Sequence, residues 1–191
     1  MLRFLQTVGW LACIIYSSIP SFWLIIHPRI EYWRARSRSP YRVLVPLWLL
    51  MWIILGAITW PWRHVQLYRT PLSWIPAVAL FACGILLYRA GGRRFSREQL
   101  GGRPELEPAR HEQRLVTTGI RSRVRHPIYL AHFCELMGWS IGTGLAVCFA
   151  LTVFAIITGV FMLRVEDREL EQRFGDEYRE YRRRVPAILL F

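Results

Sequence analysis

Apolar residues are grouped in long segments along this chain. Four segments contain no charged side chain, and a fifth, shorter segment contains His132 and Glu135. A helix that crosses the hydrocarbon core of a bilayer needs about 20 predominantly apolar residues, and the four uncharged segments reach or approach that length. The pattern therefore predicts an all-α integral membrane protein with about five transmembrane helices. In chain order, these predicted helices are residues 4–26, 43–60, 72–88, 127–141 and 145–163.

The predicted helices leave no room for a second domain. The last two are joined tightly through Gly142, Thr143 and Gly144. The first apolar segment is too long for the apolar core of a signal peptide, and no small-residue cleavage site follows it. We therefore expect it to remain as a membrane helix, in one domain that covers residues 1–191.

Basic residues are distributed unevenly among the loops. The formal net charge is +12, and all 25 basic residues are Arg. A charge of this sign is compatible with nucleic-acid binding, but in a membrane protein basic loops mark the cytoplasmic side. Segments 28–42, 89–125 and 164–184 are rich in Arg, whereas 61–71 has two and the turn at 142–144 has none. We therefore expect no nucleic-acid partner, and a bacterial inner-membrane protein with its N-terminus outside and its C-terminus in the cytoplasm.

Several kinds of site are not indicated by the sequence. The four cysteines all lie inside apolar segments and form no Cys-x-x-Cys pair, which is typical of small buried hydrophobic residues. The five histidines show no metal-ligand spacing, so we expect no metal site. A Rossmann fingerprint, a phosphate-binding Walker loop and a hydrolase Gly-x-Ser-x-Gly motif do not occur.

The densest group of chemically informative residues precedes the fourth predicted helix. Pro127 suits the first position of a helix, so His126 is expected to cap it. The start of a helix attracts anions through its free N–H groups and partial positive charge. Arg121, Arg123 and Arg125 come just before it, so the segment predicts an anion site at the cytoplasmic membrane surface. The alternative for the arginines is that they only mark the cytoplasmic side.

Acidic residues and an apolar stripe follow the fifth predicted helix. Glu166, Asp167 and Glu169 lie at the membrane boundary in an otherwise basic tail. The alternative for these acids is a solvated helix end, with Glu169 paired to Arg173 four residues later. We expect the helix to continue and to pack back on the protein or lie on the bilayer. This expectation rests on apolar residues at spacings of four, four, three and four, which are Leu170, Phe174, Tyr178, Tyr181 and Val185.

Several of these motifs, taken in order, resemble one family. They are Leu115-Val116-Thr117-Thr118-Gly119, Arg125-His126-Pro127-Ile128-Tyr129, the pair Glu166-Asp167, residues 174–181 and Val185-Pro186. This order and spacing is similar to that of the isoprenylcysteine carboxyl methyltransferase and phospholipid methyltransferase group of integral membrane enzymes. The resemblance covers about residues 88–191, and the first two helices match only by their presence.

The resemblance implies a methyltransferase that uses S-adenosylmethionine without a Rossmann domain and releases S-adenosylhomocysteine. The apolar pattern predicts that residues 1–88 form the first three membrane helices. The resemblance implies that 89–191 form the half that binds the cofactor, and that a cytoplasmic C-terminal helix completes the cofactor site. In that family the cofactor lies between the loop before the Arg-His-Pro motif, the start of the following helix and the acidic pair. Carried over to this chain, the cofactor-binding residues are Gln113, Arg114, Leu115, Val116, Gly119, Arg121, Arg125, His126, Pro127, Ile128, Tyr129 and Glu166.

The resemblance also bears on the methyl acceptor, which it implies is a small lipophilic or membrane-resident molecule. Many relatives carry an Arg four residues before the first acid, thought to touch the substrate. Here that position is Met162 and the nearest Arg is Arg164. This departure weighs against a prenylcysteine carboxylate and shifts the expectation toward amines, thiols or hydroxyls. Relatives also often have Tyr where this chain has Arg121.

No catalytic residue is assigned from the sequence, and Glu166, Arg164 and Glu135 are kept as candidates. Methyl transfer depends mostly on alignment and the exclusion of water, so it does not require a strong general base. Glu135 is a candidate because ionisable residues inside the membrane are functional hypotheses by default. Its alternative is a protonated or paired carboxyl that packs two helices.

Two other classes of function stay open at this point. One is a membrane oxidoreductase that resembles sterol reductases, and the other is a non-catalytic membrane scaffold. The His-Pro-Ile-Tyr segment at residues 126–129 favours the methyltransferase. Binding of S-adenosylhomocysteine rather than NADPH separates it from the reductase, and a scaffold binds neither.

Overall fold

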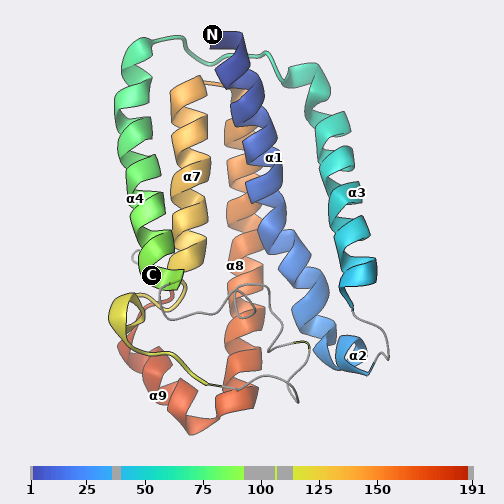
Figure 1. Ribbon diagram of the computed structural model, residues 1–191, viewed down its shortest axis with the longest axis vertical. Helices are drawn as coiled ribbons and strands as arrows, with labels where there is room; N and C mark the ends of the chain where they lie inside the picture. The colour runs from blue at the N-terminus through green and yellow to red at the C-terminus, as the bar shows by residue number, and fades with distance from the viewer. Residues whose placement is uncertain (1, 36–39, 93–105, 107–113, 189–191) are drawn as a thin grey trace.

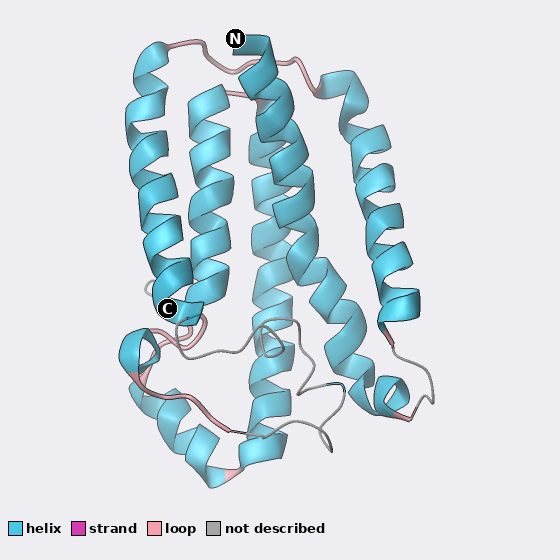
Figure 2. Ribbon diagram, viewed as in Figure 1, coloured by secondary structure: helices cyan, strands magenta, loops and turns pink. Residues whose placement is uncertain are grey.

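The helices of this protein stand side by side in one bundle. The structure is a computed structural model, and it describes residues 2–35, 40–92, 106 and 114–188. The described secondary structure is helical, with one isolated bridge between Gln66 and Leu145 (Figures 1 and 2). The α-helices are α1 (Leu2–Ile26), α2 (Ile30–Arg34), α3 (Tyr41–Thr59), α4 (Trp74–Gly92), α7 (Pro127–Thr143), α8 (Ala146–Phe174) and α9 (Asp176–Arg184). The short 3-10 helices are η1 (His27–Arg29), η2 (Trp60–Trp62), η3 (Pro71–Ser73) and η4 (Gly119–Ser122).

Four helical segments of the described chain are long and apolar enough to cross a membrane. They are Arg3–Arg34, Tyr41–Trp62, Pro71–Gly92 and Ala146–Phe174. The predicted all-α integral membrane protein is therefore confirmed. The fifth predicted span corresponds to α7, which has 17 residues and packs among α1, α4 and α8 (Figure 1).

The outward faces of the bundle are apolar, as expected for a protein surrounded by lipid. On α3, Ile53 and Ile58 are 68% and 57% exposed, and on α4, Ile75 and Leu86 are 69% and 65% exposed. A soluble protein rarely exposes large contiguous apolar surfaces of this kind. The exposed residues include Cys83 on α4, so the prediction of four buried cysteines holds for three of them and is wrong for Cys83. A thiol on this face need not be buried by protein, because the surrounding lipid is itself apolar.

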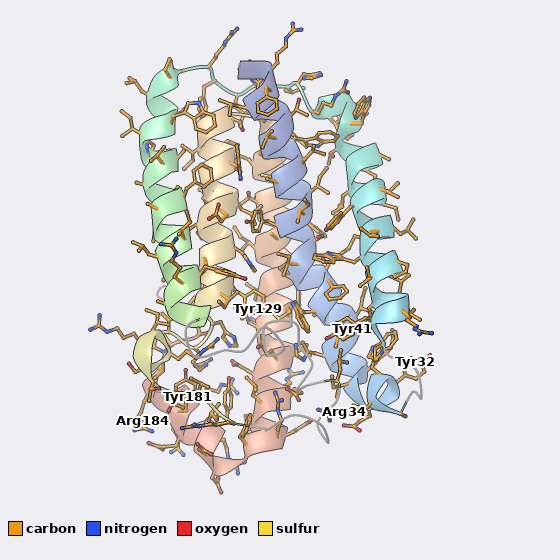
Figure 3. The ribbon with its side chains drawn as sticks, viewed as in Figure 1. Tyr32, Arg34, Tyr41, Tyr129, Tyr181 and Arg184 are labelled. Atoms are coloured by element: carbon orange, nitrogen blue, oxygen red, sulfur yellow. The ribbon has the colours of Figure 1, made fainter. Side chains whose placement is uncertain are left out.

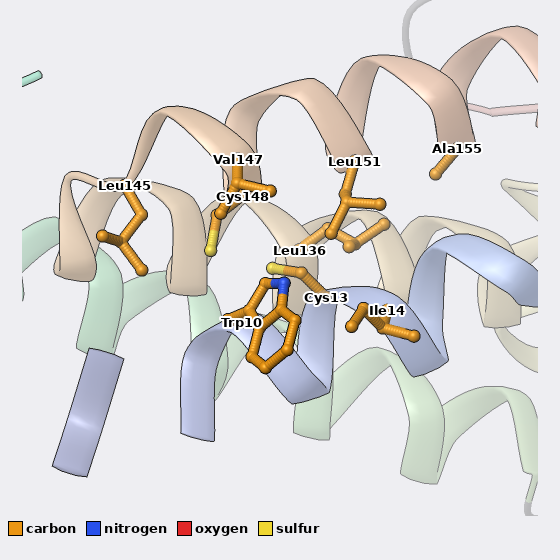
Figure 4. Packing of buried hydrophobic residues seen from close by; sticks show 9 residues of the cluster. All are labelled: Trp10, Cys13, Ile14, Leu136, Leu145, Val147, Cys148, Leu151 and Ala155. Carbon is orange, nitrogen blue, oxygen red and sulfur yellow. The ribbon is translucent and has the colours of Figure 1, made fainter. Parts of the chain in front are cut away.

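The main core lies between α1, α7 and α8. Trp10, Cys13 and Ile14 of α1 pack against Leu136 of α7 and a row of residues along the first half of α8 (Figure 4). That row comprises Leu145, Val147, Cys148, Leu151 and Ala155. Three side-chain hydrogen bonds link α1 to α3: the indole of Trp10 donates to Thr59, and those of Trp48 and Trp52 both donate to Ser18. Helix α3 is therefore attached to the bundle through α1.

The expectation that one helix runs on through the C-terminal tail is wrong in one respect. Helix α8 extends to Phe174, 11 residues beyond the predicted apolar span, but the helix then ends, and α9 begins after Gly175. Gly175 has φ +58°, a conformation that glycine adopts without steric cost. The apolar stripe survives this break, because Tyr178, Tyr181 and Val185 are buried together with Leu115, Leu170 and Phe174. The tail therefore packs back on the protein, as one of the two predicted alternatives states.

The segment between α3 and α4 is fastened to the turn between α7 and α8. The N–H of Leu67 donates to the carbonyl of Gly144 at 2.8 Å, and the N–H of Ala146 donates to that of Val65 at 3.0 Å. The hydroxyl of Tyr68 donates to the carbonyl of Ile141 at 2.7 Å. Gly144 has φ +64°, and a Cβ atom there would lie 2.5 Å from the Tyr68 carbonyl oxygen. Only glycine fits at this position.

We predict that Gly144→Ala destabilises the protein. A left-handed conformation costs a non-glycine residue roughly 1–2 kcal/mol, and the contact with Tyr68 forces the segment away from the turn. The measurement is the midpoint of thermal unfolding of the purified protein in detergent, which should fall by several degrees. Gly92→Ala is the matched control, because a Cβ at Gly92 meets no atom within 4 Å. An equal loss in both variants would contradict this reading of Gly144.

Candidate functional site

The predicted site residues meet at one end of the bundle. The start of α7, the second half of α8, and α9 lie together at the end opposite the N-terminus (Figure 1). Figure 3 shows Tyr129 of α7 and Tyr181 of α9 at this end. The Arg-rich segments 89–125 and 164–184 are predicted to lie on the same side of the membrane. Of these segments, the described residues 114–125 and 164–184 lie at this one end of the molecule.

The carboxylate of Asp167 is the centre of a buried polar network at this end. It accepts from Nη2 of Arg125 at 2.8 Å and lies 3.0 Å from Nε2 of His126. The hydroxyl of Tyr178 also donates to it. All four side chains are buried, at 8% exposure or less. The network therefore joins the residues just before α7 to α8 and α9.

Each charge in this network has a partner, as burial requires. Removing a carboxylate or a guanidinium from water is unfavourable unless ion pairing and hydrogen bonds replace the water. Here the two oxygens of Asp167 are shared among Arg125, His126 and Tyr178. Burial, together with the hydrogen bond to the Asp167 carboxylate, raises the pKa of Tyr178 well above its ordinary value. Tyr178 therefore acts as a hydrogen-bond donor throughout the physiological pH range.

The tail closes over the start of α7 through backbone contacts. The N–H groups of Arg125 and His126 donate to the carbonyls of Pro186 at 2.9 Å and Ala187 at 3.0 Å. The guanidinium of Arg125 also donates to the carbonyl of Val185 at 2.5 Å. The hydroxyl of Tyr181 donates to the carbonyl of Arg121 at 2.6 Å. The guanidinium of Arg121 then bonds the carbonyl of Arg125 at 2.8 Å. These contacts fix the loop that carries the Arg-His-Pro motif.

Glu166 differs from its neighbour Asp167 because one of its carboxylate oxygens forms no hydrogen bond with the described residues. Its Oε2 is buried and accepts no hydrogen bond from the described residues, although Nδ1 of His126 lies 3.6 Å away. His126 therefore stands between the two acids, with one ring nitrogen toward each. Because a buried carboxylate oxygen without a partner is unfavourable, this oxygen is suited to accept a hydrogen bond from a bound molecule.

His27 is a residue of this region that the sequence analysis did not select. It is 7% exposed, its ring lies 5.5 Å from that of Trp23, and its Nδ1 has no hydrogen-bond partner among the described residues. Its imidazole is within electrostatic range of Glu166, Glu169, Arg173 and His126. The signal available in the sequence is a histidine at the end of an apolar segment, which by itself indicates only where a helix ends.

The other predicted cofactor-binding residues fall into four groups. Gln113 lies outside the described residues. Arg114 is exposed, while Leu115 packs against the buried cluster of Tyr178, Tyr181 and Val185, so this stretch reaches α9. Pro127 is fully buried at the first position of α7, with Ile128 and Tyr129 following it and the rings of His126 and Tyr129 6.1 Å apart. Gly119 begins the short helix η4 that carries Arg121, whose pKa burial lowers.

The three catalytic candidates occupy different places. Glu166 faces His126, as described above, whereas Arg164 is exposed on α8. Glu135 is nine residues beyond His126, so it lies about 13 Å further along α7. It faces α4, because a Cβ at Gly84 would lie 2.9 Å from its Oε1. The structure therefore brings Glu166, but not Arg164 or Glu135, together with the start of α7.

Rings from α1, α4 and α7 form a row around His132, in which Tyr88 is 45% exposed. The ring of His132 lies 6.3 Å from Tyr129, 5.5 Å from Tyr16 and 6.3 Å from Tyr88. Nδ1 of His132 is buried without a hydrogen-bond partner among the residues described. This row continues the polar site from the membrane surface toward Glu135. As for metals, no group of His, Cys, Asp and Glu in the described ranges is arranged to hold an ion.

A bundle of membrane helices closed at one end by this network defines a class of integral membrane proteins, and comparison with known proteins identifies the family. The phospholipid methyltransferase family matches residues 73–177, more than half of the chain. This chain belongs to that family. No solved structure matches it.

Named relatives agree with this assignment. The human protein-S-isoprenylcysteine O-methyltransferase is 40% identical over 86 residues, which are 40% of this chain and 28% of the relative. Protein-S-isoprenylcysteine O-methyltransferase B of Arabidopsis thaliana is 34% identical over 83 residues, 41% of this chain and 40% of the relative. The nickel-cobalt-cadmium resistance protein NccN of Alcaligenes xylosoxydans xylosoxydans is 35% identical over 125 residues, which are 61% of this chain and 52% of the relative. The chain thus spans about a quarter to a half of these relatives.

We predict that Asp167→Asn strongly destabilises the protein. The substitution leaves the buried guanidinium of Arg125 without its counter-charge, and breaking a buried pair costs about 3–5 kcal/mol. Asp176→Asn is the control, since Asp176 is 95% exposed in its pair with Arg179 and a surface pair contributes about 1 kcal/mol or less. Thermal and denaturant unfolding in detergent measure both. Equal stability of the two variants would show that the Asp167 network does not support the fold.

Proposed function

We propose that this protein transfers a methyl group from S-adenosylmethionine to a small lipophilic or membrane-resident acceptor. The observation that supports this most directly is the position of Glu166, whose unbonded Oε2 lies 3.6 Å from Nδ1 of His126 at the start of α7, inside the segment that matches the phospholipid methyltransferase family. The names of the isoprenylcysteine O-methyltransferase relatives are consistent with it.

The described residues fit such a cofactor. Bound S-adenosylmethionine supplies an activated methyl group on a positively charged sulfur. The free Oε2 of Glu166 is placed to accept from an amino or hydroxyl group, and Nδ1 of His27 is a second unpartnered polar atom nearby. Tyr129 offers a ring for packing, and the start of α7 with Arg121 offers a place for a carboxylate. The remaining proposed contacts are Gln113 to Val116, Gly119, Arg125, Pro127 and Ile128.

The chain's own residues provide alignment and exclusion of water. The network of Asp167 fixes His126 and the loop before it, while the tail covers the start of α7. A rigid, covered site holds two reactants close together, which accounts for much of the acceleration in a displacement of this type. No strong acid or base is required for an acceptor that is already an anion. For a neutral amine, thiol or hydroxyl, Glu166 and His27 are the groups placed to receive its proton.

The proposed membrane arrangement follows from the fold and the charge pattern. Helix α7 would be the fifth membrane helix, with the N-terminus outside and the C-terminus, α9 and the site on the cytoplasmic side of a bacterial inner membrane. The cofactor would then enter from the cytosol. The acceptor would enter sideways from the bilayer, where the row of rings around His132 leads from the site toward Glu135.

The cofactor proposal predicts that Glu166→Gln and His126→Ala each weaken the binding of S-adenosylhomocysteine. Loss of a hydrogen bond to a charged group costs about 1.5–3 kcal/mol, which corresponds to roughly tenfold or more in affinity. Isothermal titration calorimetry on the purified protein measures this. Glu180→Gln on α9 is the control, because Glu180 is 53% exposed and, within the described residues, pairs only with its helix neighbours Arg183 and Arg184. Unchanged affinity in folded Glu166 and His126 variants would count against the site, and tighter binding of NADPH would favour a reductase.

The acceptor proposal predicts turnover of molecules that partition into the membrane. Labelled S-adenosylmethionine is incubated with the protein in nanodiscs and with amine, thiol, hydroxyl and prenylcysteine acceptors in competition. We expect methylation of lipophilic amines, thiols or hydroxyls, because the fully buried Met162 replaces the Arg expected for a carboxylate acceptor. Turnover of a prenylcysteine alone would refute that preference. Saturable turnover only of acceptors that stay in water would refute a membrane-resident substrate.

A further inference from the structure

The end of the bundle opposite the candidate site contains a polar cavity of about 460 Å³. Its lining comes from the start of α1 and from the segment that joins α3 to α4, which passes over the same end as the N-terminus (Figure 1). Small-molecule sites in proteins usually have volumes of about 300–1,000 Å³, so the space exceeds that needed for one ion. The lining residues are Arg3, Gln6, His64, Gln66 and Arg69.

The walls of this cavity are held in place. The backbone bonds of Val65 and Leu67 to the α7–α8 turn, and the bridge between Gln66 and Leu145, fix the segment that carries three of the lining residues. The contact of Tyr68 with Gly144 anchors it further. A cavity bounded by a fastened segment and the first turns of a core helix is preformed, which lowers the entropic cost of binding.

The polar groups of the cavity point to an anionic ligand. Gln6 is 8% exposed and lines the cavity, and no hydrogen bond joins its side chain to the other described residues. Arg3 and Arg69 bring two permanent positive charges, and neither forms an ion pair within the described part of the chain. His64 and Gln66 add further hydrogen-bond donors. The five described lining residues can all donate hydrogen bonds, and no Asp or Glu is among them.

The absence of carboxylates extends to the surrounding sequence. Residues 1–30, 59–80 and 136–165 contain no Asp or Glu, and they include the end of each bundle helix that lies on the side of the cavity. The positive charges of the cavity therefore have no counter-charge from these segments. Arginine binds phosphate through paired, charge-assisted hydrogen bonds, so a phosphate group is the ligand that suits this donor set.

We propose that this cavity binds a phosphate-bearing anion, either the headgroup of an anionic lipid in the adjacent leaflet or a free phosphate compound. The 17 residues of α7 alone separate the two ends of the bundle by about 25 Å. The bound group therefore takes no part in methyl transfer, and this site stands independently of the proposed enzyme activity. Its effect is on the protein itself, by joining α1 to the segment between α3 and α4.

The test compares Arg69→Gln and Arg3→Gln with a matched control, Arg63→Gln. Arg63 lies in the same segment and carries the same charge, but its guanidinium covers the ring of Trp60 at 3.4 Å and donates to the Trp60 carbonyl at 2.7 Å. It does not line the cavity. Binding of short-chain phosphatidylglycerol, short-chain phosphatidylcholine and inorganic pyrophosphate to the full protein in detergent is measured by native mass spectrometry and thermal shift.

We expect phosphatidylglycerol to bind the unaltered protein more tightly than phosphatidylcholine, and to lose about tenfold in affinity with Arg69→Gln or Arg3→Gln but not with Arg63→Gln. Binding of pyrophosphate with the same dependence on Arg3 and Arg69 would support the site and assign it to a free phosphate. An equal loss in all three variants would overturn the proposal in favour of diffuse surface charge, and so would failure of both probes to bind. An unchanged midpoint of thermal unfolding without ligand in each variant confirms that the fold is intact. Because this control does not use S-adenosylhomocysteine, the result is separate from the fate of the methyltransferase proposal.

Discussion

The carboxylate of Asp167 is the group on which the candidate site depends. It is buried where three chain segments meet, and it is held by a guanidinium, an imidazole and a phenol from the other two. Taking an anion out of water is tolerable only because these partners replace the solvent. The same partners are thereby fixed, since Arg125 and His126 cannot move without leaving a buried charge exposed to apolar surroundings.

This arrangement separates two acids that are adjacent in sequence. On a helix, neighbouring residues point about 100° apart, so Asp167 faces the packed interior while Glu166 faces His126 from the side. Asp167 is satisfied by the protein and Glu166 is not. The different surroundings of these two acids therefore follow from their positions on α8. His126 lies beside both acids, so the hydrogen bonds that hold its ring against Asp167 also fix the ring nitrogen that faces Glu166.

The architecture could be predicted from the sequence because hydrophobic length is a strong signal. The four long apolar helices and the start of α7 at Pro127 were evident from the residues themselves. The break at Gly175 was not, because the apolar stripe has helical spacing on both sides of it. The exposure of Cys83 was hidden because an apolar residue on a membrane helix is favourable whether it faces lipid or protein.

The site itself was only partly accessible from the sequence. Motif resemblance indicated Arg125, His126 and Glu166, but it could not divide the roles of Glu166 and Asp167, which depend on helix rotation. His27 lies outside the segment that matches the family, and only the folded bundle brings it near Glu166. The polar cavity at the opposite end of the bundle could not be predicted either, because its lining combines residues 3 and 6 with residues 64, 66 and 69, which are far apart in the sequence.

The hydrogen bonds from the backbone of Arg125 and His126 to Pro186 and Ala187 also constrain the order in which parts of the protein fold during synthesis. A ribosome delivers the start of α7 to the membrane long before it delivers the segment that covers it. In that interval the side chains of Arg125 and His126 lack the carboxylate, the phenol and the carbonyls that later surround them. The membrane helices can therefore insert and associate during synthesis, whereas the polar end of the bundle can assume its final form only once residues 185–187 have left the ribosome.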